Sequence, residues 1–455
     1  MKRFKLYAVL IAMVTFVACS DDDFDSQLTT DLETDTFIFT AQGGEQSFML
    51  TTNDKWFVSE LPEWLSVDVK DVEEATTRSV SFTEGKKEVT IIVSKNTENK
   101  ARSIELFLST LNGTMLKLNV VQDKKPELSG YWILSEGNPG RGDAELAWYD
   151  VNTKKLETKQ FKERNPNKLG DTGNDLKMYG SKMYVVVHGE GIGIGTETTE
   201  DNSYIEVINP IDGKSIERIP FKDAQGTPAK PRSIIFEGGY GYISGYSNEI
   251  ARLDTTTLTL DKHATLSGTF AEGLAYNDGK IYVCNSGQTK DNTISVVDVE
   301  SMKETEKITT AMNPYSIVSV SSGVLYFSTN WPEYALYKLT TDNNKITEIP
   351  GLSVSDMTYI NNNIYTSSFS WDTYMGEVYQ FNTTTEKATE VNLDLVSEGI
   401  DLLREYHIGT INGSDYLYLT GMGDDVVIFD PSTQEIKHAF KTGTDYVNSV
   451  VAVYK

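Results

Sequence analysis

The sequence predicts an all-β protein, with an N-terminal Ig-like β-sandwich followed by a seven-bladed β-propeller. Three observations support this fold class. Residues 36–122 hold short runs of β-branched and aromatic residues between turns, without helical periodicity. From residue 129 onward, a strand pattern bearing a tyrosine recurs with a core period of roughly 40 residues, as in four-stranded blades. The two ends of this repeat region each carry only part of a blade.

The first 18 residues predict a lipoprotein signal peptide. Lys2, Arg3 and Lys5 precede a 6–17 apolar run, which is shorter than the ~20 residues of a membrane span. Cys19 follows Phe-Val-Ala, which resembles a lipobox and implies lipidation of Cys19. The alternative is an ordinary signal peptide with a chance cysteine. Residues 19–35 are acidic and are expected to form a flexible tether.

The segment 20–23 reads Ser-Asp-Asp-Asp and resembles the tag that exports Bacteroidetes lipoproteins to the outer face of the outer membrane. The alternative is a solvated tether without an export role. We therefore expect a lipid-anchored outer-membrane protein that faces the cell exterior. The formal net charge of −25 and pI of about 4.6 argue against nucleic acid and anionic lipid head groups as partners.

Cysteine usage predicts no intrachain disulfide, because only Cys19 and Cys284 are present. Cys19 is the expected lipid attachment point. Cys284 ends the apolar and aromatic run 280–284, where a buried free thiol is expected.

Residues 36–123 predict the sandwich, with about seven strands at 37–40, 47–51, 55–59, 65–69, 88–93, 102–109 and 115–121. Trp56, Trp64, Asn96, the run 102–106 and the terminal Val-Val-Gln at 120–122 together resemble the BACON domain. A longer polar insertion at 68–83 departs from that family. The family name implies carbohydrate binding, whereas a spacer role with both tryptophans in the core is the favoured alternative. The charged, Pro-containing linker at 123–127 marks the domain boundary.

Residues 129–455 predict the propeller. The second strands of its blades carry a tyrosine in six copies: Tyr184, Tyr242, Tyr282, Tyr326, Tyr365 and Tyr418. Seven outer strands are expected, at 155–161, 215–221, 257–266, 302–309, 345–350, 385–393 and 435–441. The segment 131–134 has a second-strand pattern and 447–454 a first-strand pattern. We expect these two ends to complete one blade and close the ring, which removes the exposed sheet edge.

The long variable loops lie on one face of such a ring and predict the binding face. Aromatic and polar residues in loops, where packing does not require them, are candidates for recognition. The expected ligand-binding residues are Glu136, Asn138, Arg141, His188, Arg232, Tyr246, Asn285, Gln288, Tyr315, Asn330, Trp331, Phe369, Trp371, Tyr374, Met422 and Asp424. The alternative for Trp331, Phe369 and Trp371 is that they cap blade interfaces.

Motifs for catalysis or metal binding are weak. The glycine-rich segment 189–195 precedes a polar stretch rather than the helix that a dinucleotide loop requires. The histidines, at 188, 263, 407 and 438, lack metal-ligand spacing, and Asp143, Asp150, Asp424 and Asp425 form no calcium-loop motif. No nucleophile elbow is present. We therefore predict no catalytic residue, no metal, no cofactor and no enzymatic activity.

Several segments of the repeat together resemble a known family. They are 134–138 (Leu-Ser-Glu-Gly-Asn), 163–166, 169–176, 179–187, 284–287 and 291–298. These look like the BtuG family, YncE-like propeller lipoproteins of gut Bacteroidetes. The resemblance implies that the protein captures cobalamin (vitamin B12) and passes it to a TonB-dependent, BtuB-like outer-membrane transporter. The BACON-like part and the 188–202 insertion depart from the family pattern. The competing hypotheses are a glycan-binding or adhesive surface protein and, last, a propeller lyase or hydrolase that uses His188.

Overall fold

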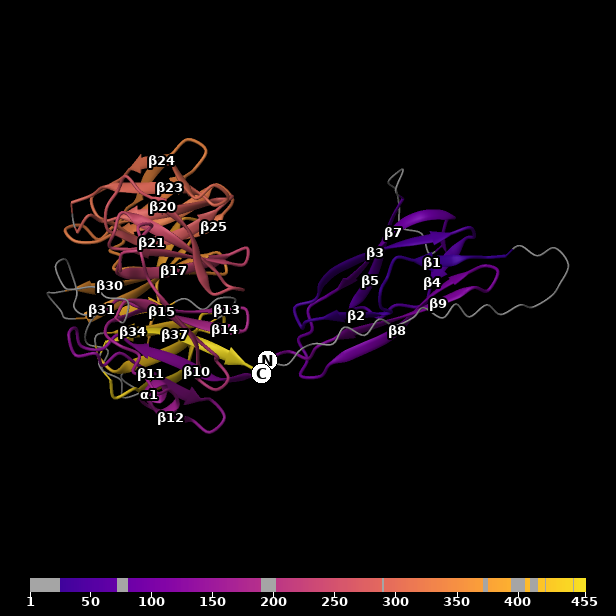
Figure 1. The fold of residues 1–455 in the computed structure, drawn as a ribbon, viewed down its shortest axis with the longest axis horizontal. Coiled ribbons are helices and arrows are strands. Elements are labelled where there is room, and N and C mark those ends of the chain that lie inside the picture. Colours follow the sequence, from indigo (N-terminus) through magenta and orange to yellow (C-terminus); the bar gives the residue numbers. More distant parts are fainter. Residues whose placement is uncertain are drawn as a thin grey trace. The chain divides into compact units, whose positions relative to one another are not determined.

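The computed structural model describes residues 25–71, 81–189, 202–288, 290–370, 375–393, 406–409, 416–421, 423–444 and 446–455. The chain divides into two compact units, Met1–Glu127 and Leu128–Lys455 (Figure 1). No helix within the described ranges is long and apolar enough to cross a membrane. Cys19 and the segment 20–23 lie outside the described residues.

The first unit consists of two β-sheets that share one core. One sheet has the order β1-β3-β7-β5, with strands β1 (Leu28–Thr30), β3 (Gly44–Thr52), β5 (Leu65–Asp71) and β7 (Gly85–Val93). The other has the order β2-β9-β8-β4-β6, with strands β2 (Thr36–Phe39), β4 (Trp56–Val58), β6 (Ser81–Phe82), β8 (Arg102–Thr110) and β9 (Met115–Gln122). Inward-facing residues of both sheets, such as Leu50, Ile91, Leu106 and Val120, form a single apolar cluster, so the two sheets pack face to face.

This unit differs from the sequence prediction near its N-terminus and in the predicted insertion, and it agrees in its core. The predicted insertion at 68–83 contains the end of β5 and the short strand β6. Strand β1 pairs with β3, so residues 28–30 belong to a sheet rather than to a flexible tether. Trp56 is fully buried in the core, as the spacer hypothesis expected. Trp64 packs at the edge of the core, and the Arg102 guanidinium lies 4.7 Å from its ring centroid.

The second unit consists of four-stranded antiparallel sheets, and seven of them can be counted in the described residues. We number these blades along the chain. Blade 1 contains β10 (Leu128–Ser135), β11 (Glu145–Asp150), β12 (Lys155–Glu157) and β37 (Val447–Tyr454). Blade 2 contains β13 (Gly173–Tyr179), β14 (Lys182–Val187), β15 (Tyr204–Ile208) and β16 (Ser215–Pro220). Blade 3 contains β17 (Pro231–Glu237), β18 (Tyr240–Gly245), β19 (Glu249–Asp254) and β20 (Thr259–Thr265).

The remaining blades repeat the same order from the inner to the outer strand. Blade 4 contains β21 (Ala271–Asn277), β22 (Lys280–Asn285), β23 (Thr293–Asp298) and β24 (Lys303–Thr309). Blade 5 contains β25 (Pro314–Ser321), β26 (Val324–Thr329), β27 (Leu336–Thr340) and β28 (Lys345–Ile349). Blade 6 contains β29 (Asp356–Ile360), β30 (Asn363–Ser370), β31 (Met375–Asn382) and β32 (Lys387–Glu390). Blade 7 contains β33 (Tyr406–Gly409), β34 (Leu417–Gly421), β35 (Asp425–Asp430) and β36 (Glu435–Lys441).

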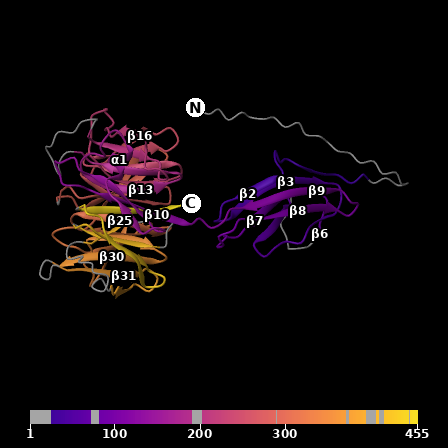
Figure 2. The ribbon, with the colours of Figure 1, turned by 90° about the horizontal axis from the view of Figure 1, so that it is seen from below.

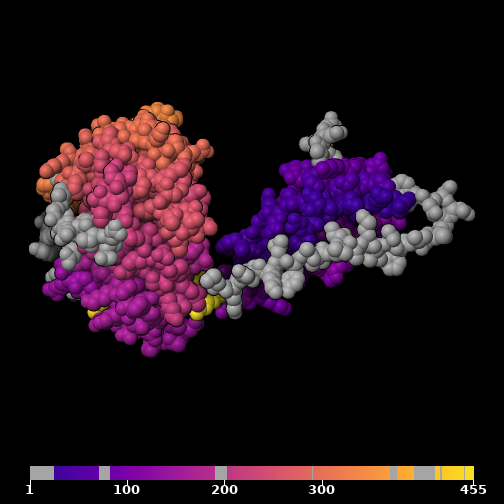
Figure 3. Space-filling view, viewed as in Figure 1, coloured from indigo at the N-terminus to yellow at the C-terminus, as the bar shows by residue number. Residues whose placement is uncertain are grey.

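Blade 1 joins the two ends of the propeller, which confirms the predicted closure. Strand β37 pairs antiparallel with β10, with Trp132 opposite Val451 and Ile133 opposite Val450. Figures 1 and 2 show the C-terminal strand beside β10, and in Figure 3 the yellow C-terminal residues lie against purple residues of blade 1. The inner strand of each blade contacts the inner strand of the next, and β37 contacts both β13 and β33, so the inner strands form a closed ring.

An aromatic residue occupies the same register position on the second strand of every blade. In blades 2 to 7 it is the predicted tyrosine, and in blade 1 it is Trp132. Each of these rings is buried in an apolar cluster that also contains residues of the next blade. Tyr418 of blade 7, for example, meets Tyr131 of blade 1 edge-on, with ring centroids 5.6 Å apart. The repeat therefore arises because each blade must cover the apolar face of its neighbour.

Two outer strands are clearly shorter than the sequence predicts. Strand β32 covers only residues 387–390 of the predicted 385–393. Strand β12 ends at Glu157, and the helix α1 (Gln160–Arg164) follows where the prediction extended the strand to residue 161. The carboxylate of Glu145 accepts hydrogen bonds from the backbone N–H groups of Phe161 and Lys162, at 2.8 and 3.3 Å. This bonding satisfies donors that the start of a short helix leaves free.

Strand direction separates the two faces of the ring. We call the upper face the one at which the inner strands begin. It carries the loops between second and third strands and the loops that lead from each outer strand to the next blade. The opposite face has short turns, in which the side chain of Asp150, Asp254, Asn382 or Asp430 accepts bonds from backbone N–H groups two and three residues later. Seven of the expected candidate residues lie in upper-face loops: Glu136, Asn138, Arg141, Gln288, Asn330, Trp331 and Asp424. Arg232, Tyr315 and Asn285 were expected in loops but lie on the strands β17, β25 and β22.

Candidate functional site

Five inner strands carry a β-bulge close to their first residue, at the mouth of the ring on the upper face. Each bulge places one extra residue on the inner strand relative to the second strand, in β13, β17, β21, β25 and β37. A bulge re-aims the side chain that it inserts. We call the five residues at these positions the rim residues: Asn174, Arg232, Glu272, Tyr315 and Asn448. The rim residues therefore come from five separate blades and occupy equivalent positions on their inner strands.

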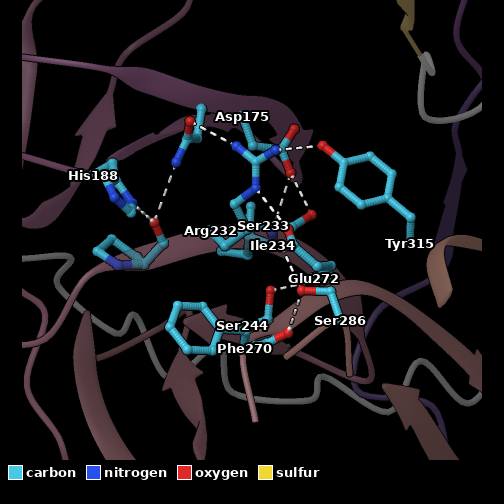
Figure 4. Close-up of polar contacts among 12 residues, drawn as sticks. Asp175, His188, Arg232, Ser233, Ile234, Ser244, Phe270, Glu272, Ser286 and Tyr315 are labelled. Carbon is cyan, nitrogen blue, oxygen red and sulfur yellow. Dashed lines mark hydrogen bonds and ion pairs between the residues drawn. The ribbon is translucent and has the colours of Figure 1, made fainter. Parts of the chain in front are cut away.

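Arg232 joins four consecutive blades through this set (Figure 4). Its Nε donates to Glu272 Oε2 of blade 4 at 2.9 Å, and one terminal nitrogen donates to Asn174 Oδ1 of blade 2 at 2.8 Å. The other terminal nitrogen donates to the hydroxyl of Tyr315 in blade 5 at 2.7 Å. Since one side chain reaches three other blades, the rim residues converge near the axis of the ring.

Further hydrogen bonds hold the ion pair of Arg232 and Glu272 in place. Ser286 donates to Glu272 Oε1 at 3.0 Å, and Ser244 donates to the backbone carbonyl of Glu272 at 2.6 Å (Figure 4). Glu272 is buried and the Arg232 side chain is 23% exposed. The charges of the pair compensate each other, so this part of the rim offers directional hydrogen bonding rather than a net charge.

The phenol groups at the rim keep their protons at neutral pH. Arg232 lowers the pKa of Tyr315, but burial and Glu272 outweigh it, and the pKa lies above its ordinary value. Burial raises the pKa of Tyr246 well above its ordinary value. Because Arg232 donates to the oxygen of Tyr315, the hydroxyl proton of Tyr315 remains able to donate to a ligand.

His188 lies under the rim and is buried. Its Nδ1 lies 3.0 Å from the backbone carbonyl of Pro231, which makes Nδ1 the donor (Figure 4). The His188 ring also meets the Tyr246 ring edge-on, with centroids 5.0 Å apart. Burial lowers the pKa of His188 to about 4. A neutral, buried imidazole is suited to packing beneath the rim.

The other expected residues fall into three groups. Glu136, Asn138 and Arg141 lie in the loop between β10 and β11, and Gln288, Asn330, Trp331 and Asp424 lie in the corresponding loops of other blades. Trp331 is 61% exposed. Asn285 is fully buried, and its amide donates to the hydroxyls of Thr293 and Ser295 within blade 4, so it has no surface for a ligand. Trp371, Tyr374 and Met422 lie outside the described residues, and for Phe369 only the backbone of β30 is described.

The structure brings together Arg232, Tyr315, Tyr246 and His188 from the expected set. Sequence reasoning did not select Asn174, Glu272 or Asn448. The signal that could have found them is their shared position, two residues before a buried aliphatic residue of each inner strand, as in Asn174-Asp175-Leu176 and Glu272-Gly273-Leu274. Among the described residues, no three His, Cys, Asp or Glu side chains gather as metal ligands.

Comparisons with known proteins leave the family open. No protein-family model matches the chain. No curated protein matches it either. Among solved structures, hydrazine synthase of Kuenenia stuttgartiensis is 15% identical, with 61% of this chain and 89% of that chain covered and a TM-score of 0.47.

Two further solved structures are similarly distant. The WD40 repeats of RRP9 are 11% identical, with 60% and 80% covered and a TM-score of 0.47. The dihydro-heme d1 dehydrogenase NirN is 11% identical, with 79% and 69% covered and a TM-score of 0.43. Two of these three are enzymes by name and the third is not, and likeness at this level decides neither the activity nor the family. The all-β propeller fold itself is read from the sheet order and ring closure described above.

Replacement of Glu272 should lower the stability of the folded protein measurably. Glu272→Ala leaves the charge of Arg232 without its carboxylate, and we expect the free energy of unfolding to fall by about 2 kcal/mol in urea denaturation. The matched control is Glu105→Ala, which removes an ion pair between exposed Glu105 and Lys117 and should cost less than about 1 kcal/mol. Equal losses in both variants would contradict the assigned role of Glu272.

The pKa of His188 predicts a pH dependence of stability. The pKa falls from 6.5 in the unfolded chain to about 4 in the fold, so the unfolded state takes up a proton first as pH falls. The contribution of His188 is fully present above pH 6.5 and is lost towards pH 4, by on the order of 3 kcal/mol in total. Unfolding measured from pH 7 to pH 4 should therefore show a shallower decline in His188→Gln. Parallel curves for the two proteins would refute this assignment.

Proposed function

We propose that this protein binds a small-molecule ligand on the upper face of its propeller and does not transform it. The observation that carries the proposal is the rim, where hydrogen bonds between four blades fix Arg232, Glu272, Asn174 and Tyr315. Binding groups that are fixed in advance lose little conformational entropy when a ligand arrives. The ion pair at the rim is internally compensated, and His188 is neutral and buried, which favours recognition over acid-base chemistry.

The ligand that we propose is cobalamin, as the resemblance to the BtuG family implies. A corrin ring carries amide groups on its edge and has flat apolar faces. The amide of Asn448 and the phenol of Tyr315 are suitable hydrogen-bonding partners for such amides. Aromatic side chains of the upper face, such as exposed Trp331, suit the flat faces of the ring.

The proposed cellular role follows from the N-terminal segment and from the same resemblance. Lipidation at Cys19 would anchor the chain to the outer membrane, and the acidic segment that follows favours the outer face. We propose that the captured corrinoid passes from there to a TonB-dependent, BtuB-like transporter. Isolation of the chain with its neighbours from native membranes tests this partner.

A second candidate function is glycan binding. The exposed indole of Trp331 favours it, because sugar rings stack on exposed aromatic faces. A glycan array separates the two functions. Binding to a glycan that is lost in Trp331→Ala, with no binding of corrinoid, would replace the first proposal by the second.

Calorimetric titration of the full-length chain with cyanocobalamin tests the proposal. We expect binding, and we expect Tyr315→Phe and Asn448→Ala each to weaken it roughly three- to ten-fold, since one hydrogen bond contributes about 0.5 to 1.5 kcal/mol. The controls are Tyr379→Phe, whose hydroxyl bonds Glu377 on β31, and Asn343→Ala in the turn between β27 and β28. Both controls should bind as the unaltered protein does. Absence of binding, or equal losses in rim and control variants, would refute the proposal.

A further inference from the structure

The upper face also contains a pocket over blade 1, which none of the functional arguments above uses. Its volume is about 350 Å³, within the range of small-molecule sites. It is lined by Asn138, Asp143, Glu145, Lys159, Lys162 and Lys168, with small residues filling the rest of the wall. Three lysines in one pocket are unexpected in a chain with a net charge of −25.

The walls of this pocket come from three upper-face segments that hydrogen bonds fasten together. They are the loop between β10 and β11, the segment between β12 and β13, and the loop that leads from β36 to β37. The backbone of Glu136 donates to the carbonyl of Tyr446 at 2.8 Å, and that of Ala144 donates to the carbonyl of Gly170 at 3.0 Å. Gly142 N donates to the Asp171 carboxylate at 2.9 Å. The pocket is therefore built into the closure of the ring rather than formed by loose loops.

A glycine is required in this wall. Gly137 has a φ of +81°, and a Cβ there would lie 2.6 Å from the backbone nitrogen of Ala144. The loop thus approaches its own far end too closely for a side chain at this position.

The charges of the pocket are not balanced. Asp143 accepts a bond from the backbone N–H of Asn138 at 2.7 Å, and Glu145 Oε1 is used by the backbone N–H groups of Leu146, Phe161 and Lys162. Both carboxylates are thus engaged by the wall. None of the three lysines forms an ion pair within 4.0 Å in the part of the chain that the structure describes, although Glu145 attracts Lys162 electrostatically. The pocket lining therefore contains three lysines and two carboxylates, and both carboxylates already accept hydrogen bonds from backbone N–H groups.

We propose that this pocket binds a phosphate group. Three lysines line this one space, and their ammonium groups match the several acceptor oxygens of phosphate, for which lysine is a common ligand. The phosphate can come from free phosphate or from the phosphodiester of a larger ligand such as cobalamin. The pocket uses a different set of residues from the rim, so a site for free phosphate stands without the corrinoid function, whereas a site for the phosphodiester rests on it.

Titration calorimetry at constant ionic strength tests the proposal with three probes. They are inorganic phosphate, cyanocobalamin, which contains a phosphodiester, and dicyanocobinamide, a corrinoid without it. The pocket variant changes Lys159, Lys162 and Lys168 to Gln. The control variant changes Lys303, Lys345 and Lys387 to Gln. These are exposed lysines of outer strands that carry the same charge in total and lie outside the pocket. All six lysines are exposed, so both variants should retain the melting temperature of the unaltered protein.

We expect the pocket variant to lose at least about ten-fold in affinity for a phosphate-bearing probe, while the control changes by less than about two-fold. A loss for inorganic phosphate identifies a site for free phosphate. A loss for cyanocobalamin without a loss for dicyanocobinamide identifies the phosphodiester as the bound group. A pocket variant that matches the unaltered protein with every probe, including the case in which nothing binds, overturns the proposal. If neither corrinoid binds but phosphate does, the function proposed above fails and the phosphate site stands.

Discussion

The pairing of β37 with β10 is the interaction on which the rest of the propeller depends. It joins residues more than 300 positions apart in the sequence, as the bond from Ser129 to the carbonyl of Val453 illustrates. Without it, blade 1 lacks its inner strand and the ring has two open edges. With it, every blade covers the apolar face of the next, and the aromatic residue of each second strand is buried between neighbours. A closed ring then holds seven inner strands at fixed positions.

Both proposed sites follow from that closure. The rim residues lie on inner strands, and Asn448 is on the closing strand itself. The pocket over blade 1 is bounded by the loop that leads into β37. In each site, side chains of one blade bond to groups of another, so their geometry depends on the ring and not on any single blade. This arrangement explains how loops of varied sequence can present fixed polar groups.

The repeat and its closure could be predicted from sequence because they depend on local pattern. The tyrosine that recurs on six second strands, and the partial blades at the two ends, can be recognised from hydrophobic alternation. The rim could not be predicted in this way. Arg232 finds partners 40, 58 and 83 residues away, and its orientation depends on a one-residue bulge, which is a property of strand register. Helix α1 was missed because five residues are too few for a periodic signal, and distant Glu145 stabilises its start.

Hydrogen–deuterium exchange of the native protein tests the closure most directly. The backbone amides of Trp132–Leu134 and Val447–Val453 should exchange as slowly as those of the inner strands β21 and β25. The reason is that separating β37 from β10, which we call opening the seam, requires the ring to unfold. Rapid exchange across β37, while β21 and β25 remain protected, would show that the seam is open in the native state. The rim and the pocket would then lose their common support.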